Sequence, residues 1–245
     1  MTPGPVLILG GRSDMGLAIA HRFAAGGHPV WLAARTPETL DVDRGDIALR
    51  HGVEVRLFAF DVLDTAGHAA FVAGLPALPQ VVVCAVGLLG DQKASERDAD
   101  TATLVMRSNF EGPALILGAF ATAFEARGAG TIVGIGSVAG ERGRASNYVY
   151  GAAKAGFAAF LSGLRNRLAA RGVHVVTVLP GFVATRMTEG MNLPAKLTAQ
   201  PSEVGEAVFN AVARKRNLIR VRPIWTLIMA IIRNIPEPVF KKLKL

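Results

Sequence analysis

Tyr148 and Tyr150, the only tyrosines of the chain, lie two residues apart and just ahead of Lys154. A phenol is a weak proton donor at neutral pH, because its ordinary pKa is about 10. A lysine four residues further along a helix lies on the same side of it, and its cation favours the phenolate. Tyr150 and Lys154 have this spacing, whereas Tyr148 is spaced in this way from Ala152. The pattern predicts that Tyr150 is a proton donor with a lowered pKa and that Tyr148 lines the substrate pocket.

Further candidate binding residues follow the ends of apolar runs. The stretch GGRSDMG at 10–16 follows the first run, as expected of a turn that binds a pyrophosphate at a helix N-terminus. Arg35 follows the second run, where an arginine suits a cofactor 2′-phosphate and an acid would suit a ribose hydroxyl. Asp61 follows the third run and suits an adenine amine, and the small residues around Ala85 leave room for a flat ring. We therefore expect NADP(H), with NAD(H) as the alternative.

The chain alternates short apolar runs with longer segments of helical periodicity. The pattern predicts strands at 5–9, 29–34, 53–60, 80–86, 130–136, 173–179 and 217–221, and helices near 15–25, 64–74, 101–126, 148–170 and 202–213. Strands that are nearly continuous apolar runs are typical of a parallel sheet covered by helices on both faces. We expect one α/β domain with a doubly wound sheet of about seven strands and a ligand site at their carboxyl ends.

Ser137 ends the fifth predicted strand, thirteen residues before Tyr150. A serine in such a place is most often a helix cap or a turn residue. Together with YGAAK at 150–154 and PGFVAT at 180–185, however, it resembles the pattern of the short-chain dehydrogenases/reductases, and the likeness covers essentially the whole chain. Asn109 falls where that family keeps a fourth catalytic residue. The resemblance implies a Rossmann-fold, NAD(P)-dependent reductase of carbonyl groups that assembles as a homodimer or homotetramer.

The resemblance also implies a role for each site residue. Tyr150 gives a proton to the carbonyl oxygen as hydride arrives, and Ser137 hydrogen-bonds that oxygen. Lys154 also holds the nicotinamide ribose, and Asn109 positions a water for proton relay. Thr185 and the Val183 backbone bind the carboxamide, and no metal is expected. The expected cofactor contacts are Gly10, Gly11, Arg12, Ser13, Asp14, Met15, Gly16, Arg35, Asp61, Val62, Ala85, Val86, Gly87, Tyr150, Lys154, Pro180, Gly181, Val183 and Thr185.

Two departures from the family pattern narrow the resemblance. Asp14 replaces the middle glycine of the first turn, and Arg12 is expected to offset its charge. Cys84-Ala85-Val86-Gly87 replaces the usual Asn-Asn-Ala-Gly. With SNFEGPA at 108–114 and the tail IRNIPEPVFKKLKL, the chain resembles the decaprenylphosphoryl-2-keto-pentose reductases, which complete the arabinose donor for cell-wall arabinan.

The substrate class has three interpretations. The narrower resemblance implies a polyprenyl-phosphate-linked 2-keto-pentose. A generic short-chain reductase of a hydrophobic ketone or a 3-oxoacyl thioester would carry the same four catalytic residues. A cofactor-sensing binding protein of this fold is disfavoured, since such proteins commonly lose the tyrosine or the lysine, and both are present.

The net charge of +8 is confined to residues 214–245, which hold nine basic residues and one acid. One interpretation is that 1–222 form the reductase domain and that 223–245 are an extension that caps the sheet and the pocket. The other is that Trp225 and the aliphatic residues after it enter a membrane interface or hold a polyprenyl chain. Basic side chains would then face anionic headgroups, namely Arg233, Lys241, Lys242 and Lys244. Nucleic acid is not expected, because the tail lacks interleaved aromatic residues.

The remaining bulk features concern the cellular compartment. Cys84 is the only cysteine, so an intramolecular disulfide is excluded and a reduced compartment is expected. The N-terminal residues lack the basic and apolar regions of a signal peptide. No apolar run approaches the roughly 20 residues that span a bilayer. We expect a cytoplasmic protein, with peripheral contact to the inner face of the cell membrane as the option raised by the tail.

Overall fold

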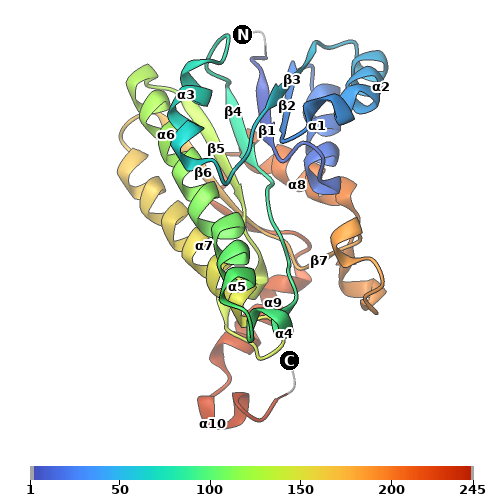
Figure 1. Ribbon diagram of the computed structural model, residues 1–245, viewed down its shortest axis with the longest axis vertical. Helices are drawn as coiled ribbons and strands as arrows, with labels where there is room; N and C mark the ends of the chain where they lie inside the picture. The colour runs from blue at the N-terminus through green and yellow to red at the C-terminus, as the bar shows by residue number, and fades with distance from the viewer. Residues whose placement is uncertain (1–2, 244–245) are drawn as a thin grey trace.

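The computed structural model describes residues 3–243 and places seven parallel strands in one sheet, in the order β3-β2-β1-β4-β5-β6-β9 (Figure 1). These strands are β1 (Val6–Leu9), β2 (Val30–Ala34), β3 (Val55–Ala59), β4 (Val81–Cys84), β5 (Gly130–Ile135), β6 (Val173–Leu179) and β9 (Leu218–Arg220). A separate two-stranded sheet pairs β7 (Phe182–Val183) with β8 (Thr198–Ala199). The strand order reverses between β1 and β4, which is where open α/β sheets bind ligands.

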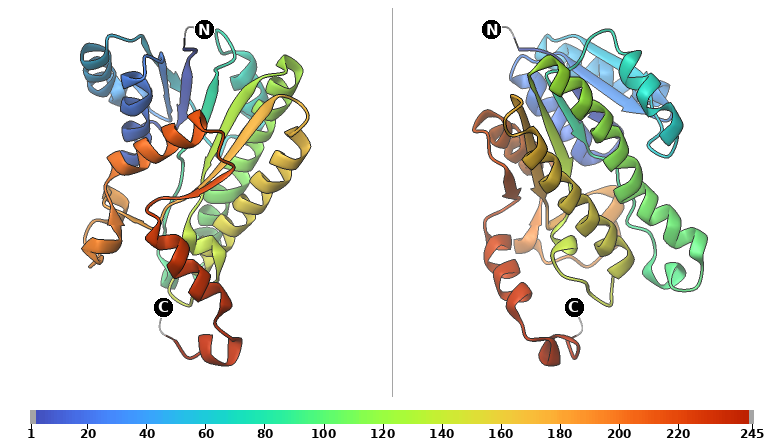
Figure 2. Two further views of the ribbon diagram at one scale, coloured as in Figure 1. Left: turned by 180° about the vertical axis from the view of Figure 1, so that it is seen from behind. Right: turned by 90° about the vertical axis from the view of Figure 1, so that its left-hand side faces the viewer.

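Helices cover both faces of the sheet (Figures 1 and 2). They are α1 (Asp14–Ala25), α2 (Asp41–His51), α3 (His68–Ala73), α4 (Gln92–Ser95), α5 (Ala99–Met106), α6 (Gly112–Arg127), α7 (Tyr148–Leu168), α8 (Pro201–Ala213), α9 (Ile224–Asn234) and α10 (Glu237–Phe240). Alternate side chains of each strand face opposite layers. On β1, Val6 and Ile8 pack in the core with α1, α2 and α8, while Leu7 and Leu9 pack in the core with α3, α6 and α7.

The predicted doubly wound sheet is confirmed, whereas several helical segments differ from the predicted set: α4, α9 and α10 lie outside the predicted ranges, and two further differences bear on the site. Helix α2 was not predicted, because Ile47 is its only buried residue, while Val42 and Leu49 are strongly exposed. The helix predicted at 101–126 is divided by a π-helical turn at Arg107–Glu111, which separates α5 from α6. That turn carries Asn109, a predicted catalytic residue.

The C-terminal residues pack against the carboxyl ends of the sheet. Trp225 and Met229 of α9 are buried, and they join Val138 and Leu179 in a small apolar cluster of their own. The indole Nε1 donates to the Leu197 carbonyl (3.1 Å). Trp225 itself is therefore part of the core and is not exposed to a membrane interface, whereas membrane contact by the rest of the tail stays a prediction.

Polar contacts hold the same tail to the loop that follows Ser137. Arg142 donates to the carbonyls of Ile232 (2.9 Å) and Ile235 (2.7 Å) and pairs with Glu237 (2.8 Å). In that loop, Glu141 accepts from Nε of the half-buried Arg220 (3.0 Å). The end of the predicted basic tail at Lys244 lies outside the described residues. Within residues 3–243, no helix has the length and apolar character needed to cross a membrane.

Candidate active site

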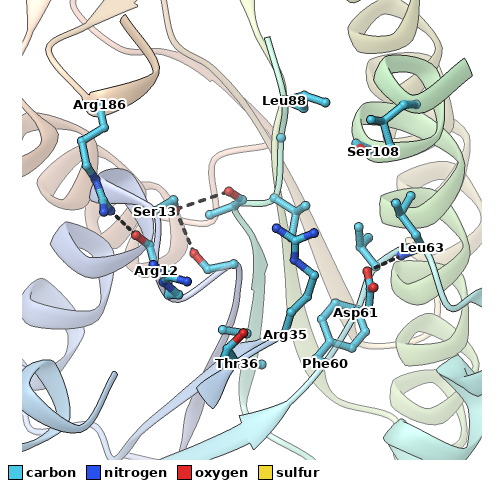
Figure 3. A pocket seen from close by; sticks show the side chains of 18 residues that line it. Arg12, Ser13, Arg35, Thr36, Phe60, Asp61, Leu63, Leu88, Ser108 and Arg186 are labelled. Carbon is cyan, nitrogen blue, oxygen red and sulfur yellow. Dashed lines mark hydrogen bonds between the residues drawn. The ribbon is translucent and has the colours of Figure 1, made fainter. Parts of the chain in front are cut away.

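A cavity of about 670 Å³ lies beyond the carboxyl ends of β1, β2, β3 and β4 (Figure 3). Its wall brings together residues from four of the predicted loops. From the predicted cofactor set, the wall contains Gly10, Arg12, Ser13, Arg35, Asp61, Val62, Ala85, Val86 and Gly87. A second cavity of about 290 Å³ shares Ser13, Ala85, Val86 and Gly87 with the first and adds Asp14, Met15, Tyr150, Lys154 and Thr185. The two cavities form an elongated cleft across the reversal point of the sheet.

The turn before α1 needs its glycines. Gly10 has a φ of +84°, and a Cβ there would lie 3.0 Å from the backbone of Ala85 and Val86. A Cβ on Gly16 would lie 2.6 Å from the Gly10 carbonyl oxygen. Ser13 caps α1, because its hydroxyl accepts from the Gly16 amide (3.0 Å) and donates to the Gly10 carbonyl (2.9 Å). This close, amide-rich turn at a helix N-terminus fits a pyrophosphate.

The cavity floor carries the residues predicted to select the cofactor. Figure 3 shows the Arg35 side chain reaching between Ser13 and Asp61, from the end of β2. Thr36 follows Arg35, so no carboxylate occupies that strand end. Asp61 accepts a hydrogen bond from the Leu63 amide (2.9 Å), which fixes its carboxylate at the cavity edge. The residues present fit a dinucleotide with a phosphate on its adenosine ribose.

The sequence predicted that Arg12 offsets the charge of Asp14, and the structure shows that it does not. Arg186 does so from the loop after β7. Its Nε donates to Oδ1 of Asp14 (2.9 Å), and its backbone amide donates to Oδ2 (2.7 Å). Arg186 also donates to the Arg12 carbonyl. The carboxylate therefore ties the helix N-terminus to the Thr185–Arg186 segment at the mouth of the cleft.

Tyr150 and Lys154 face the second cavity from α7, and Ser137 lies beside them at the end of β5. Tyr150 hydrogen-bonds the Ser137 side chain, and Ser137 also accepts from the Ala139 amide (3.1 Å). The Lys154 ammonium is buried, donates to the Ile135 carbonyl (3.0 Å) and lies 5.8 Å from the centroid of the Tyr150 ring. The structure thus brings these three predicted residues together.

The pKa of Tyr150 differs from its prediction. Burial raises the pKa of the Tyr150 phenol to about 12, and the hydrogen bond from Ser137 offsets only part of that rise. Burial also lowers the pKa of Lys154 to about 8. Because burial penalises the charged phenolate, the lowered pKa does not appear in the protein chain alone, and a lowering by Lys154 together with the positive nicotinamide of the bound cofactor stays a prediction.

Asn109 is fully buried in the π-helical turn and fastens the loop after β4. Its amide nitrogen donates to the carbonyls of Leu88 (2.6 Å) and Val105 (2.8 Å), and its oxygen accepts from the Leu88 amide (3.2 Å). A Cβ on Gly87 would lie 3.0 Å from that oxygen and 3.5 Å from the Lys154 ammonium. Asn109 is therefore close to Lys154, and its part in proton relay stays a prediction.

A third, smaller cavity adjoins Ser137 and Tyr150 on the side of the C-terminal tail. Its wall is mostly apolar and includes Leu89, Val138, Phe182, Met187, Met191 and Trp225. The expected contacts Pro180, Gly181, Val183 and Thr185 also lie here. A Cβ on Gly181 would lie 1.9 Å from the indole of Trp225, so the tail helix packs directly on this strand end. The position suits the substrate, next to the proton donor.

Tyr148 does not line this cavity, contrary to its prediction. It begins α7 with 46% of its side chain exposed, and Arg144 and Asn147 are in the wall instead. Neither residue was predicted from the sequence. Their place in the loop between Ser137 and Tyr150 is the signal that could have identified them, because both ends of that loop carry site residues.

Comparison with known proteins agrees with this geometry. The family model described as short chain dehydrogenase matches residues 5–195. An uncharacterized oxidoreductase of Mycobacterium tuberculosis is 37% identical over 244 residues, covering 98% of this chain and 96% of that protein. A solved NAD(P)-dependent gluconate 5-dehydrogenase from Beutenbergia cavernae, described as putative and bound to NADP, has a TM-score of 0.81 at 27% identity, covering 91% of this chain and 96% of that one. Actinorhodin polyketide ketoreductase with NADPH has a TM-score of 0.78 at 26% identity, covering 89% and 95%.

The chain belongs to the short-chain dehydrogenase family, and it is an NAD(P)-dependent oxidoreductase. The family alone leaves the substrate open.

Proposed function

We propose that this enzyme reduces a keto group to a secondary alcohol, with NADPH as the preferred reductant, on a polyprenyl-phosphate-linked 2-keto-pentose. Ser137 and Tyr150 lie in the wall of an apolar cavity, and Tyr150 and Lys154 lie in the wall of the adjoining cofactor cleft; this placement of Tyr150 between the two carries the proposal. When bound, the nicotinamide supplies a hydride to the carbonyl carbon. The enzyme would then serve synthesis of an arabinose donor for the cell wall, as the motifs of the narrower resemblance imply.

The chain's own residues would complete the reduction. Tyr150 carries its proton at neutral pH, since its pKa is about 12, and it would release this proton to the oxygen as negative charge develops there. The Ser137 hydroxyl would hydrogen-bond the same oxygen. Lys154 would steady the phenolate that remains and hold the ribose, and Thr185 with the Val183 backbone would hold the carboxamide. Asn109 would position the water that returns a proton to the site.

An assay of the purified protein with a lipid-linked 2-keto-pentose tests this function. NADPH and NADH are compared at equal concentration, and loss of absorbance at 340 nm is matched to formation of the alcohol. Tyr150→Phe is the inactive control. Turnover of simple hydrophobic ketones or 3-oxoacyl thioesters, without turnover of the lipid-linked sugar, would favour the generic reductase instead. The apolar wall and the likeness to a polyketide ketoreductase support that second candidate.

The tail supports a proposal about where such a substrate is met. On α9, Ile224, Leu227 and Ile231 are exposed at one-turn spacings, on the side away from buried Trp225 and Met229. We propose that this stripe and the exposed basic residues of the tail contact an anionic membrane surface, each lysine or arginine contributing about 1 kcal/mol. Residues 223–245 would then act as an extension of the 1–222 reductase domain.

Vesicle cosedimentation tests the membrane proposal. We expect binding that requires anionic lipid and weakens as salt screens the basic side chains. Leu227→Ser with Ile231→Ser should reduce it, whereas Leu49→Ser, a change at an exposed leucine on α2, should not. Binding that depends neither on lipid charge nor on Leu227 and Ile231 would overturn the membrane proposal.

Assembly as a homodimer or homotetramer is a further proposal. The exposed apolar side chains of Leu104, Phe110 and Leu115 near α5 and α6 support it, and light scattering tests it.

A further inference from the structure

The substrate cavity contains buried polar atoms that lack partners within the protein. Among residues 3–243, six buried side-chain nitrogen or oxygen atoms have no hydrogen-bond partner, and two of them belong to residues of this cavity wall: Nε of Arg144 and Oδ1 of Asn147. A buried polar group without a partner loses its hydration and gains no hydrogen bond in return, so it is destabilising. Two such groups in one wall, three and six residues before Tyr150, therefore suggest a ligand that satisfies both.

Arg144 is the only charged residue in the wall of this cavity, within the part of the chain that the structure describes. Its Nη2 makes only a weak contact, a donation to the Met229 sulfur (3.4 Å). Glu141 is the nearby acid, but its carboxylate is engaged by Arg220 and Arg233. Burial lowers the pKa of Arg144, and Glu141 offsets this in part. The guanidinium is therefore a half-buried cation without an ion-pair partner among residues 3–243.

We propose that Arg144 and Asn147 form an anion subsite of the substrate cavity, so that the keto substrate carries an anionic phosphate or carboxylate group and a nearby hydroxyl. An arginine suits such a group, because its N–H donors form charge-assisted hydrogen bonds with anionic oxygens. The Asn147 oxygen requires a donor, and a hydroxyl supplies one. The apolar walls from Phe182, Met191 and Trp225 would hold the rest of the molecule.

This subsite deepens the proposed function and rests on the assignment of this cavity to the substrate. Its chemistry does not depend on the lipid-linked sugar. A phosphate on a lipid, a phosphate on a soluble metabolite and a carboxylate would all satisfy Arg144. The test therefore uses probes that separate these sources and requires no turnover.

Calorimetry of the cofactor-saturated enzyme provides the test, because saturation keeps phosphate probes out of the cofactor cleft. The probes are octyl phosphate, octanoate, octanol and inorganic phosphate. We expect wild type to bind octyl phosphate or octanoate at least tenfold tighter than octanol. Tighter binding of octyl phosphate than of inorganic phosphate would indicate an amphiphile, and the reverse order would indicate a small soluble anion.

Variants test whether Arg144 causes the preference for anionic probes over octanol. Arg144→Met should remove most of the difference between octyl phosphate and octanol, and Arg144→Lys should retain part of it. Arg214→Met, the same loss of charge at an exposed site, should leave it unchanged. Cofactor binding and the midpoint of thermal unfolding verify that each variant folds. Equal binding of anionic and neutral probes by wild type, or a preference that survives Arg144→Met, would overturn the proposal. A lipid-linked keto-pentose that is not turned over would refute the proposed substrate and leave this subsite intact.

Discussion

Replacing Trp225 with alanine should release the C-terminal helix from the substrate cavity. The indole is 4% exposed, packs on Gly181, lies edge-to-face with Phe182 at 5.3 Å between ring centroids and donates to the Leu197 carbonyl. Large-to-alanine changes of buried aromatic residues cost about 3–5 kcal/mol. In a chain of this length about 4 kcal/mol corresponds to a fall of about 8–16 °C in the unfolding midpoint if unfolding is cooperative.

Leu227→Ala on the same helix is the matched control. Leu227 is 60% exposed, so its truncation should change stability by less than about 0.5 kcal/mol. Hydrogen exchange should accelerate across 224–234 in Trp225→Ala and stay at the wild-type rate in Leu227→Ala. The Michaelis constant of any reducible ketone should rise in Trp225→Ala, because the cavity loses a wall. Equal stability and equal exchange in the two variants would refute the packing that places Trp225 in the core.

Three further predictions concern the acid, the cofactor and the pH dependence of stability. Tyr150→Phe should abolish turnover and leave cofactor binding within a few-fold of wild type, whereas Tyr148→Phe should keep most activity; reversed phenotypes would contradict the assignment. Arg35→Ala should weaken NADPH binding more than tenfold, or about 1.4 kcal/mol, with little effect on NADH; a wild type that prefers NADH would exclude this role. Burial lowers the pKa of His68, so the unfolded chain takes up a proton that the folded chain resists, and stability should fall as pH drops below about 6.5. In thermal melts, His68→Gln should lose less stability than wild type between pH 7 and pH 5. A loss equal to that of wild type would argue against this role of His68.

The sheet and its site were predictable because both depend on local pattern. The core strands are continuous apolar runs, and parallel strands bring their carboxyl ends to one edge of the sheet. Arg35 follows such a strand and lines the cleft, and Ser137 follows another and lines the adjoining cavity, so their placement at one edge of the sheet follows from the topology. Helix α2 lacked this signal, since a single buried residue, Ile47, leaves no apolar stripe to detect.

Contacts between distant segments were not predictable from the sequence. Asp14 and Arg186 are 172 residues apart, and no spacing rule relates the turn before α1 to the loop after β7. Arg12 was the nearest cation in sequence, which made it the expected partner. Trp225 was ambiguous for a related reason: an apolar helix with basic neighbours suits both a protein core and a membrane interface. The buried fraction of each side chain separates these two environments, and it follows from tertiary packing.

The same limit explains the pKa of Tyr150. The i, i+4 spacing correctly predicts that Tyr150 and Lys154 share one side of α7, but it says nothing about how much water remains around them. Burial penalises the charged form of each group, so it raises the phenol pKa to about 12 and lowers the lysine pKa to about 8. The two shifts move the pKa values of Tyr150 and Lys154 apart, and the pKa of the phenol does not move toward neutral pH. For a reductase this is a workable arrangement, because the donor keeps its proton until charge develops on the carbonyl oxygen. In the proposed reduction, Lys154 and Ser137 would then stabilise the phenolate as it forms.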